Sequence, residues 1–419
     1  MKRTIFHIDV NSAYLSWEAT YRLQQQVDCI DLRKIPSIIG GDQSKRHGIV
    51  LAKSIPAKKY GIKTGESIFS ARQKCPSLVV VPPNYQLFMQ CSDAMVNIFR
   101  EYFPIVERYS IDECFLDYTT MNHHFGSPMQ FAHYIKDKIQ KELGFTVNIG
   151  ISNNKLLAKM ASDFEKPNKI HTLYPHEIQE KMWHLPVRDL FMVGRATSSK
   201  LNKLGIYTIG ELANTDINLL YSHFKSHGYV IHNFANGLDK SSVKPCSPTP
   251  KGIGNSTTIS FDVETSRTAK LILLSLTETV CMRLRDCDMK ANMVSINIKS
   301  SDFSSLSHQM HLSQSTDITN TIYSTVCTLF DEAWNNKPIR QLGIRVSTLV
   351  PNENIQLSLF DYKNTEKYTA LDKSIDTIRT KYGKNAIIRA SFLHSGLKPL
   401  CGGMPEENYP IMSSTTLRN

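Results

Sequence analysis

Long apolar runs and paired cysteines are missing from this sequence. No segment approaches 18 consecutive apolar residues, which excludes a membrane-spanning helix. The nine cysteines include no CxxC spacing, and the closest pair, Cys281 and Cys287, has five residues between its members. This spacing excludes a disulfide framework and a zinc site, and it favours a reducing cytoplasm. Polar residues from His7 onward interrupt the apolar run at the amino terminus before a secretory signal is complete, so we expect a cytoplasmic protein.

Acidic residues are outnumbered. The 419 residues include 49 Lys and Arg against 38 Asp and Glu, which gives a net charge of +11 and a pI near 9.1. Such a balance favours a polyanionic partner without establishing one. Residues 1–170 hold 22 basic and 16 acidic side chains, so more than half of the surplus lies there. With 41% hydrophobic residues and this length, the sequence predicts a folded protein of three or four domains.

Two adjacent acids, Asp112 and Glu113, lie between the β-prone runs 105–109 and 115–116. The pattern predicts a hairpin or a sharply bent strand with both carboxylates at its tip. A regular strand would send the two side chains to opposite faces, so only a bend can aim them at one point. A lone pair of this kind is usually a solvated turn, but a third acid, Asp9, ends another β-rich run. Three carboxylates could then converge on divalent cations, which prefer oxygen ligands.

An amphipathic helix is predicted directly after Asp9, capped by Asn11 or Ser12. Tyr14 lies five residues past Asp9 and is either a core aromatic or a wall beside whatever a bound metal holds. Farther along, a basic cluster consists of Lys53, Lys58, Lys59 and Lys63. It is either a solvated face or a set of cations that neutralises phosphate oxygens.

The first 170 residues predict an α+β domain. Apolar residues recur at helical spacing over 86–102 and 128–143, residues 145–151 alternate as a strand, and a helix capped within 152–154 ends before Pro167. The order strand, helix, hairpin, helix, strand, helix places Asp9 and the Asp112 hairpin on adjacent central strands.

Residues 187–213 predict two short helices with glycine-containing turns. Gly194-Arg195 precedes the first helix and Gly205 follows it, and the backbone N–H groups at such helix starts can bind a phosphate.

A proline-rich linker at 244–250 precedes a separate α/β domain at 251–350. Its expected strands cover 254–261, 293–300, 307–312 and 341–349, and its expected helices cover 268–285 and 317–334.

Two features follow this domain. The apolar pentapeptide that contains Gln356, Leu357, Leu359 and Phe360 is either a packed edge or an exposed peptide ligand. One face of a predicted helix at 369–382 is marked by Leu371, Ile375, Ile378 and Tyr382.

Three ordered motifs in this chain resemble those of the Y-family translesion DNA polymerases, most closely the UmuC-like bacterial branch of the ImpB/MucB/SamB type. The first motif runs from Asp9 to Tyr14, the second from Ser110 to Glu113, and the third covers 150–159 together with 166–168. The resemblance spans residues 3–360. It implies a template-directed DNA polymerase for damaged DNA, with low fidelity and no proofreading exonuclease, and a part in the SOS response and mutagenesis.

The resemblance implies an α+β multidomain fold shaped like a right hand, with a ferredoxin-like palm, small fingers, a helix-hairpin-helix thumb and an α/β little finger. The implied boundaries are palm 1–30 and 77–170, fingers 31–76, thumb 171–240, linker 241–250, little finger 251–350 and tail 351–419.

The same resemblance implies that Asp9, Asp112, Glu113 and the Val10 carbonyl hold two Mg²⁺ ions during in-line nucleotidyl transfer. Asp112 would bridge both ions with Asp9, and Glu113 would reach only the ion at the primer terminus. Tyr14 takes the position of the steric gate that excludes a ribose 2′-hydroxyl.

Further contacts are implied with nucleotide, DNA and protein partners. Lys58 and Lys166 fall where the family contacts the triphosphate of a deoxynucleotide. Gly194, Arg195 and Gly205 would contact primer-template DNA. The peptide from Gln356 to Phe360 resembles a sliding-clamp motif, and a UmuD-like accessory protein is a possible further partner.

Four positions depart from the family pattern. Many relatives have Tyr and Arg where this chain has Ile55 and Lys58, and a Lys cannot form the bidentate fork of an Arg. Asn11 replaces an acid that is common in other branches, and Met192 stands where relatives often have Gly.

Two alternatives stay open. The first is a clamp-recruited DNA-binding factor without polymerase activity of its own, although the three carboxylates argue against it. The second is a nucleotide cyclase, for which the thumb-like helices and the clamp-like peptide would have no use.

Overall fold

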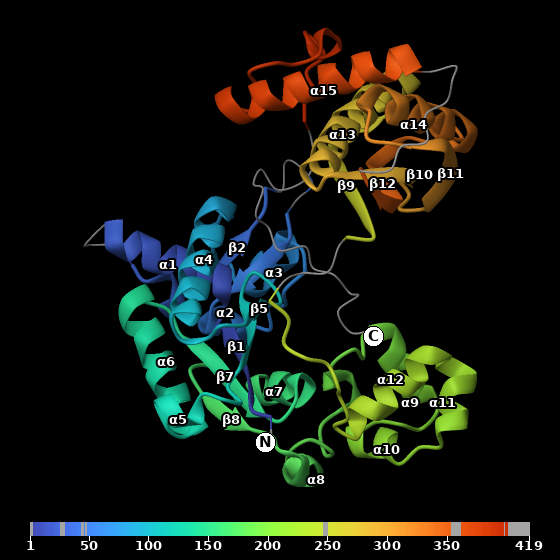
Figure 1. Ribbon diagram of the computed structural model, residues 1–419. Helices are drawn as coiled ribbons and strands as arrows, with labels where there is room; N and C mark the ends of the chain where they lie inside the picture. Colours follow the sequence, from blue (N-terminus) through green and yellow to red (C-terminus); the bar gives the residue numbers. More distant parts are fainter. Residues whose placement is uncertain are drawn as a thin grey trace. The chain divides into compact units, whose positions relative to one another are not determined.

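The computed structural model describes residues 3–25, 30–42, 46, 48–245, 250–352, 362–397 and 399–400, excepting the side chains of residues 122, 123 and 362–365. The chain forms two compact units (Figure 1). The first takes most of its residues from Met1–Gly41 and Ile49–Pro248, and the second from Thr249–Pro405. None of the helices in the described ranges combines the length and apolarity that crossing a bilayer requires.

A five-stranded sheet, here called the central sheet, forms the middle of the first unit. Its strand order is β5-β6-β1-β7-β8, and all neighbours are antiparallel except β7 and β8. The strands are β1 (Ile5–Val10), β5 (Val106–Arg108), β6 (Glu113–Asp117), β7 (Val147–Ser152) and β8 (Ile170–Thr172). The predicted hairpin is present as β5 and β6. The prediction that it lies beside the strand of Asp9 is confirmed, because β6 pairs with β1.

The two faces of the central sheet differ in chemistry because successive side chains alternate. On one face Phe6, Ile8 and Val10 join a large apolar core. The helices that contribute to this core are α1 (Ala13–Gln25), α4 (Tyr85–Tyr102) and α6 (Pro128–Leu143). The other face carries His7 and Asp9 and is covered by α7 (Lys155–Ser162). The polar face is therefore the one that can carry chemistry.

Helix α7 comes close to the sheet because β7 contains a glycine where the two cross. A Cβ atom on Gly150 would lie 1.9 Å from the Ala158 carbonyl oxygen and 2.5 Å from the Ser162 nitrogen. No side chain fits at that distance. Asn154 starts the helix, since its side-chain oxygen accepts the Leu157 N–H at 2.8 Å. This cap lies within the predicted segment 152–154.

A smaller sheet and its helices occupy the segment predicted as fingers. The strand order is β3-β2-β4, with β2 (Ser37–Gly40), β3 (Val50–Lys53) and β4 (Val79–Val81). Two short helices, α2 (Ile55–Lys59) and α3 (Ile68–Lys74), pack on it through a core of their own. Ser54 and Ser67 cap these helices.

The segment predicted as thumb is helical, with more helices than the two that the sequence indicated. It contains α8 (Ile178–Lys181), α9 (Arg195–Lys203), α10 (Ile209–Ala213), α11 (Ile217–Phe224) and α12 (Ser226–Ala235). The short remaining helices of the chain are α5 (Asn122–Phe125) and the 3₁₀ turns at Leu32–Lys34, Pro175–Glu177, Val187–Asp189 and Ala390–Phe392.

Part of the predicted linker 241–250 is bound to the central sheet. The Lys244 backbone N–H donates to Glu107 at 2.9 Å, and Arg3 donates to the Ser241 carbonyl at 2.9 Å. Val243 packs with Phe115 in a small apolar cluster. Up to Lys244 this segment therefore belongs to the first unit by its contacts.

The second unit is a four-stranded antiparallel sheet with helices on one face. The order of this C-terminal sheet is β11-β10-β12-β9, with β9 (Gly252–Val263), β10 (Met289–Ser300), β11 (Ser305–Thr316) and β12 (Ile339–Pro351). Helices α13 (Ser266–Asp286) and α14 (Thr319–Ala333) cover the apolar face. All six elements predicted for this domain are present, each with somewhat different ends.

The last helix, α15 (Tyr362–Tyr382), belongs to the second unit. Ion pairs join it to α13: Arg285 binds Asp372 and Asp376, and Glu278 binds Arg379. At the start of α14, the Thr319 backbone N–H donates to Asp372 at 2.8 Å. The helix begins seven residues before the predicted start at 369.

Candidate functional site

Two of the predicted carboxylates, Asp9 and Glu113, are direct neighbours across the strand pair of β1 and β6. Opposite residues in an antiparallel pair point to the same face, so both side chains lie on the polar face under α7. Asn148 of β7 is the other neighbour of Asp9 and completes this row. The bend of the hairpin thus gives Glu113 the orientation that the sequence required.

Asp112 precedes β6, in the turn of the hairpin, and local hydrogen bonds hold it. The Val10 N–H donates to the Asp112 carbonyl at 3.0 Å, which joins the turn to the end of β1. The Ser110 hydroxyl donates to Asp112 Oδ1 at 2.7 Å. The family resemblance implies that the Val10 carbonyl is a metal ligand. This hydrogen bond places the Val10 backbone next to Asp112.

Lysine ammonium groups bind two of the three carboxylates. Lys159 of α7 pairs with Glu113, and Lys166, just past the helix, pairs with Asp9. Lys166 also donates to Asp163 at 2.8 Å. The aromatic rings of Tyr109 and Phe191 lie 5.3 and 5.4 Å from the Lys159 ammonium. Lys159 has no role in the sequence prediction, although it ends the third motif.

The charge state of Asp9 reflects its crowded position. Burial raises the pKa of Asp9 to about 7; Lys166 acts against this shift, while Glu113 and Asp112 add to it. Burial lowers the pKa of Lys166, but the carboxylates of Asp9 and Asp163 outweigh it and leave that pKa above its ordinary value. Three mutually repelling acids close to one another are the arrangement that a bound cation would relieve.

The donor set suits a divalent cation. Carboxylate oxygens are the ligands that Mg²⁺ prefers, and ammonium groups already stand at Asp9 and Glu113 as cations. In the described part of the chain, no three His, Cys, Asp or Glu side chains are close enough together to enclose a metal as they stand. We attribute this to the two lysines, which hold the carboxylates of Asp9 and Glu113.

His7 is a neighbour of the site that the sequence reasoning missed. Its ring is fully buried below Glu113, with Nε2 3.8 Å from the carboxylate and Nδ1 2.7 Å from the Ser162 hydroxyl. Burial, followed by the nearby lysines, lowers the pKa of His7 well below its ordinary value. The signal was available, because a residue two positions before Asp9 on a strand shares its face.

Asn11 connects the first and third motifs. Its side-chain oxygen accepts the Asn168 N–H at 2.9 Å and the Thr146 hydroxyl at 3.0 Å, and its amide donates to Asn148. Of the two residues predicted as the cap of α1, Asn11 or Ser12, Asn11 directs its side chain to the neighbouring strand and loops instead. An amide can both donate and accept here, which an acid at this position could not do.

Tyr14 lies in the first turn of α1 and is half-buried. Its ring stacks on Phe88 at a centroid distance of 4.6 Å and 10°, and Tyr85 meets it edge-on. The aromatic contacts fix the ring, so Tyr14 has the packing of a core aromatic and keeps part of its surface open.

The basic cluster of the fingers segment is confined to β3, α2 and the loop that follows. Lys58 is exposed on α2. Burial and then the nearby charge of Lys58 lower the pKa of Lys53, which places these two cations close together. Lys74 and Glu66 form an ion pair beside them.

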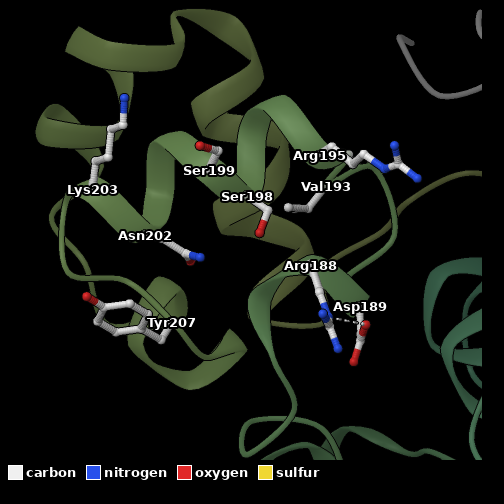
Figure 2. Close-up of a pocket in the computed structure, with 10 residues that line it drawn as sticks. Arg188, Asp189, Val193, Arg195, Ser198, Ser199, Asn202, Lys203 and Tyr207 are labelled. Carbon is white, nitrogen blue, oxygen red and sulfur yellow. Dashed lines mark ion pairs between the residues drawn. The ribbon is translucent and has the colours of Figure 1, made fainter.

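A pocket of about 780 Å³ lies on the helical segment (Figure 2). Arg188, Gly194, Arg195, Lys203 and Tyr207 are among its lining residues. Three of these are cationic, and α9 begins at Arg195 with Gly194 as its N-cap. The predicted residues Gly194 and Arg195 therefore lie in one pocket.

Met192 and Gly205 lie between lining residues of this pocket in the sequence. Both have positive φ angles, +72° for Met192 and +79° for Gly205. Glycine adopts that conformation without strain, whereas methionine does not. The glycine that relatives often have at position 192 fits this backbone.

The open face of the C-terminal sheet is polar. Ser295, Asn297 and Lys299 of β10 alternate with buried Val294, Ile296 and Ile298. Their cross-strand neighbours are polar or small: Arg345, Gly343 and Gln341 on β12, and Gln309, Ser307 and Ser305 on β11. Lys299 and Arg340 lie over the exposed Phe303 ring at 5.1 and 4.8 Å. Two cationic side chains thus gather at this exposed ring.

Cys114 is fully buried, and burial raises the pKa of its thiol to about 12, so it is not a nucleophile. The peptide from Gln356 to Phe360 lies outside the described residues.

Comparison with known proteins places these observations in a family. Residues 8–163 match the model of the impB/mucB/samB family, 250–359 match its C-terminal domain, and 175–206 match the HHH motif of the IMS family. A "DNA polymerase IV" of Clostridium acetobutylicum is 48% identical over 393 residues, which cover 94% of this chain and 99% of that relative. A "DNA polymerase IV 2" of Bacillus subtilis is 37% identical and covers 94% and 95%.

A solved structure has the same fold. It is titled "Y-family DNA polymerase chimera Dbh-Dpo4(243-245)-Dbh" and aligns with a TM-score of 0.72 over 83% of this chain and 100% of that chain, at 20% identity. The multidomain α+β fold expected from the sequence is confirmed by this alignment.

Proposed function

Since this chain belongs to the impB/mucB/samB family of Y-family polymerases and is a DNA-directed DNA polymerase, we propose that it performs translesion synthesis by two-metal-ion nucleotidyl transfer. Its substrates are primer-template DNA and deoxynucleoside triphosphates. The observation that carries the proposal is the pairing of Asp9 with Glu113 across β1 and β6, beside Asp112 in the hairpin turn.

We assign Asp9, Asp112, Glu113 and the Val10 carbonyl as ligands of two Mg²⁺ ions. When bound, the ions would activate the primer 3′-hydroxyl and neutralise the triphosphate and the leaving pyrophosphate. In this assignment Asp112 and Asp9 would hold both ions, and Glu113 would hold the one at the primer terminus. The raised pKa of Asp9 supports it, because a neighbouring cation would favour the ionised carboxylate.

The lysines then exchange partners. With a divalent cation at Asp9, Lys166 would keep its pair with Asp163 and would be available to bind a phosphate oxygen of the incoming nucleotide. With Glu113 bound to a cation, Lys159 would remain beside the rings of Tyr109 and Phe191. Lys58, exposed on α2, is a second candidate for the triphosphate.

Tyr14 is proposed as the steric gate. Its stacking on Phe88 would keep the ring from moving away from a ribose 2′-hydroxyl. A ring that is held in place excludes a larger sugar more strictly than a mobile one.

DNA binding is assigned to two surfaces. In the thumb pocket, backbone N–H groups at the start of α9 and the Arg195 side chain suit a backbone phosphate, with Gly205 forming the turn after the helix. The polar face of the C-terminal sheet, with Lys299, Arg340 and Arg345, is the second surface. Phosphate contacts of this kind hold DNA without reading its sequence.

Low fidelity without proofreading is part of the same proposal, because the resemblance to the Y-family polymerases implies it. We further propose that residues 356–360 bind a sliding clamp, that a UmuD-like protein is an accessory partner, and that the enzyme acts in the SOS response and in mutagenesis.

The proposal is tested by primer extension on a template with an abasic site in the presence of Mg²⁺. We expect the Asp112→Ala variant to lose extension by a factor of 10³ or more, on the order of two-metal catalysis, while it keeps its affinity for primer-template DNA. Asp302→Ala, on an exposed turn of the second unit, is the matched control and keeps full activity. An Asp112→Ala protein that still extends the primer would refute the site, and a parent protein that binds DNA without extending it would favour the DNA-binding factor.

A further inference from the structure

Helix α15 presents an apolar stripe to solvent. Tyr368, Leu371, Ile375, Ile378 and Tyr382 follow one another at intervals of three and four residues, so they line one face. Tyr368 is 36% exposed, Leu371 46%, Ile378 36% and Tyr382 68%, and Ile375 is half-buried. The sequence predicted this face, but a face of this kind normally packs on a core.

Charged residues hold the helix in this orientation. Arg285 of α13 donates to Asp376 at 2.5 and 3.0 Å and to Asp372 at 3.3 Å, and the Thr319 N–H donates to Asp372 at 2.8 Å. Asp372 and Arg379 are both only 5% exposed. Turning the apolar stripe inward would separate these pairs and leave buried charges without partners, which costs more than the apolar burial would return.

The segment after α15 strengthens the same anchor. Arg389 donates to Glu278 at 2.8 Å, the Arg379 guanidinium donates to the Ile387 carbonyl at 3.2 Å, and Phe392 is buried. Within the described residues the stripe stays exposed after this segment has folded back. The stripe is therefore exposed to solvent among the residues that the structure describes, with the helix held by these contacts.

The charges beside the stripe have one sign. Lys367 and Lys381 each lie one position before a tyrosine of the stripe, and the Lys381 ammonium is 5.2 Å from the Tyr382 ring. The acids Asp372 and Asp376 are bound to Arg285, and Glu366 lies on the far side of the helix by its spacing. Two copies of α15 packed stripe to stripe would thus leave their lysines without acids.

We propose that the stripe is the docking surface for an amphipathic helix of a partner protein, with acidic side chains beside its own apolar seam. The stripe from Tyr368 to Tyr382 spans four turns, about 21 Å, which a partner helix of similar length would cover. Leu371 and Ile378 insert between the partner's apolar residues, and Lys367 and Lys381 pair with its acids. None of the residues of the stripe is among those assigned to the carboxylate site or to the two DNA-binding surfaces.

The test uses the full-length protein and synthetic helices as probes. One labelled 21-residue helix has Leu at its a and d positions and Glu at e and g; its matched partner has Lys in place of Glu. At low salt we expect the acidic helix to bind at least about ten-fold more tightly than the basic helix. The ion pairs of Lys367 and Lys381 with its glutamates together account for a ratio of this size. The variant K367E/K381E should reverse the preference.

Apolar contact is tested by Leu371→Asp together with Ile378→Asp, which should weaken binding more than ~30-fold because two central anchors are lost. Lys373→Glu, exposed on another side of α15, is the control and should change the affinity less than about two-fold. Circular dichroism and primer extension show whether the variants stay folded. If the double Asp variant unfolds, the K367E/K381E variant decides the question alone.

Four results would overturn the proposal. Equal or absent binding of the two probes would remove the charge argument. A dimer that disappears in the Leu371→Asp, Ile378→Asp protein would assign the stripe to a second copy. If removal of residues 401–419 raised the affinity for the acidic helix more than ten-fold, the stripe would be the binding surface of the chain's own tail. Tighter stripe-dependent binding to anionic phospholipid vesicles than to the acidic helix would assign it to a membrane surface.

Discussion

Helices α7 and α15 both bury charged side chains, one in each unit of the molecule. Under α7, Lys155 pairs with Glu107 at 2.6 Å and Lys159 pairs with Glu113. Under α15, Arg285 binds two aspartates, and Glu278 binds two arginines. The difference lies in the cation. Each lysine is a point charge on a flexible stem, whereas a guanidinium forms several directed bonds at once.

We therefore call Lys159 and Lys166, with their carboxylates, the replaceable set, and Arg285, with Asp372 and Asp376, the permanent set. Lys159 and Lys166 pair with Glu113 and Asp9, the carboxylates that we propose as ligands of divalent cations. Arg285 is enclosed by its partners and fixes which face of α15 is exposed. In this account, ion pairs occupy the proposed cation site in the first unit and fix the exposed face of α15 in the second.

The largest expected effect comes from breaking the permanent set. Arg285→Met leaves Asp372 and Asp376 buried without a cation, so we expect the second unit to lose about 3–5 kcal/mol of unfolding free energy. Urea denaturation of the full chain, followed by circular dichroism, measures the loss. Arg345→Met, on the open face of the C-terminal sheet, is the matched control and should change stability by less than about 0.5 kcal/mol.

Replacing Lys159 by methionine tests whether the loss of a lysine costs less stability than the loss of Arg285. Lys159→Met leaves Glu113 partly exposed, so we expect a loss of only about 1 kcal/mol, which added Mg²⁺ offsets. If Arg285→Met costs no more than Lys159→Met, the two helices do not differ in the way described.

A smaller effect concerns the pH dependence of the first unit. The pKa of Asp9 is about 7 in the folded protein, against 3.8 as its ordinary value, so the folded state holds an extra proton between these limits. The stabilisation from this proton is complete below pH 3.8 and is lost as the pH rises toward 7. Without Mg²⁺, we expect the unfolding free energy of the parent to fall about 2 kcal/mol more than that of Asp9→Asn between pH 5 and pH 7.

Asp302 provides the control for this experiment. Hydrogen bonds from Ser304 and Lys337 lower the pKa of Asp302 to about 2, so it does not titrate in the tested range. Asp302→Asn should have the slope of the parent. Equal slopes for the parent and Asp9→Asn would show that Asp9 ionises normally.

The strands, the hairpin and most of the long helices could be predicted because their signals are local. Alternation around Asp9 and the run before Asp112 determine β1 and the β5–β6 hairpin, and apolar spacing determines α4 and α6. The three motifs also located the carboxylates. The short helices α11 and α12 were missed because eight to ten residues carry little periodicity.

Contacts between distant segments could not be predicted. The pairing of Lys159 with Glu113 depends on α7 crossing β7 at Gly150, and the buried His7 ring depends on the same contact. The outward face of α15 depends on Arg285, which is 87 residues from Asp372. An apolar stripe predicts a helix face, but only its partners decide whether that face is buried.

The number of divalent ions held by the three carboxylates tests the central claim most directly. The parent protein is bound to primer-template DNA with a non-extendable primer and a matching deoxynucleotide, and Mn²⁺ binding is counted by electron paramagnetic resonance. We expect two ions in the parent and the loss of at least one in Asp112→Ala. Two ions bound with unchanged affinity in Asp112→Ala would contradict the assignment of the hairpin as the metal site.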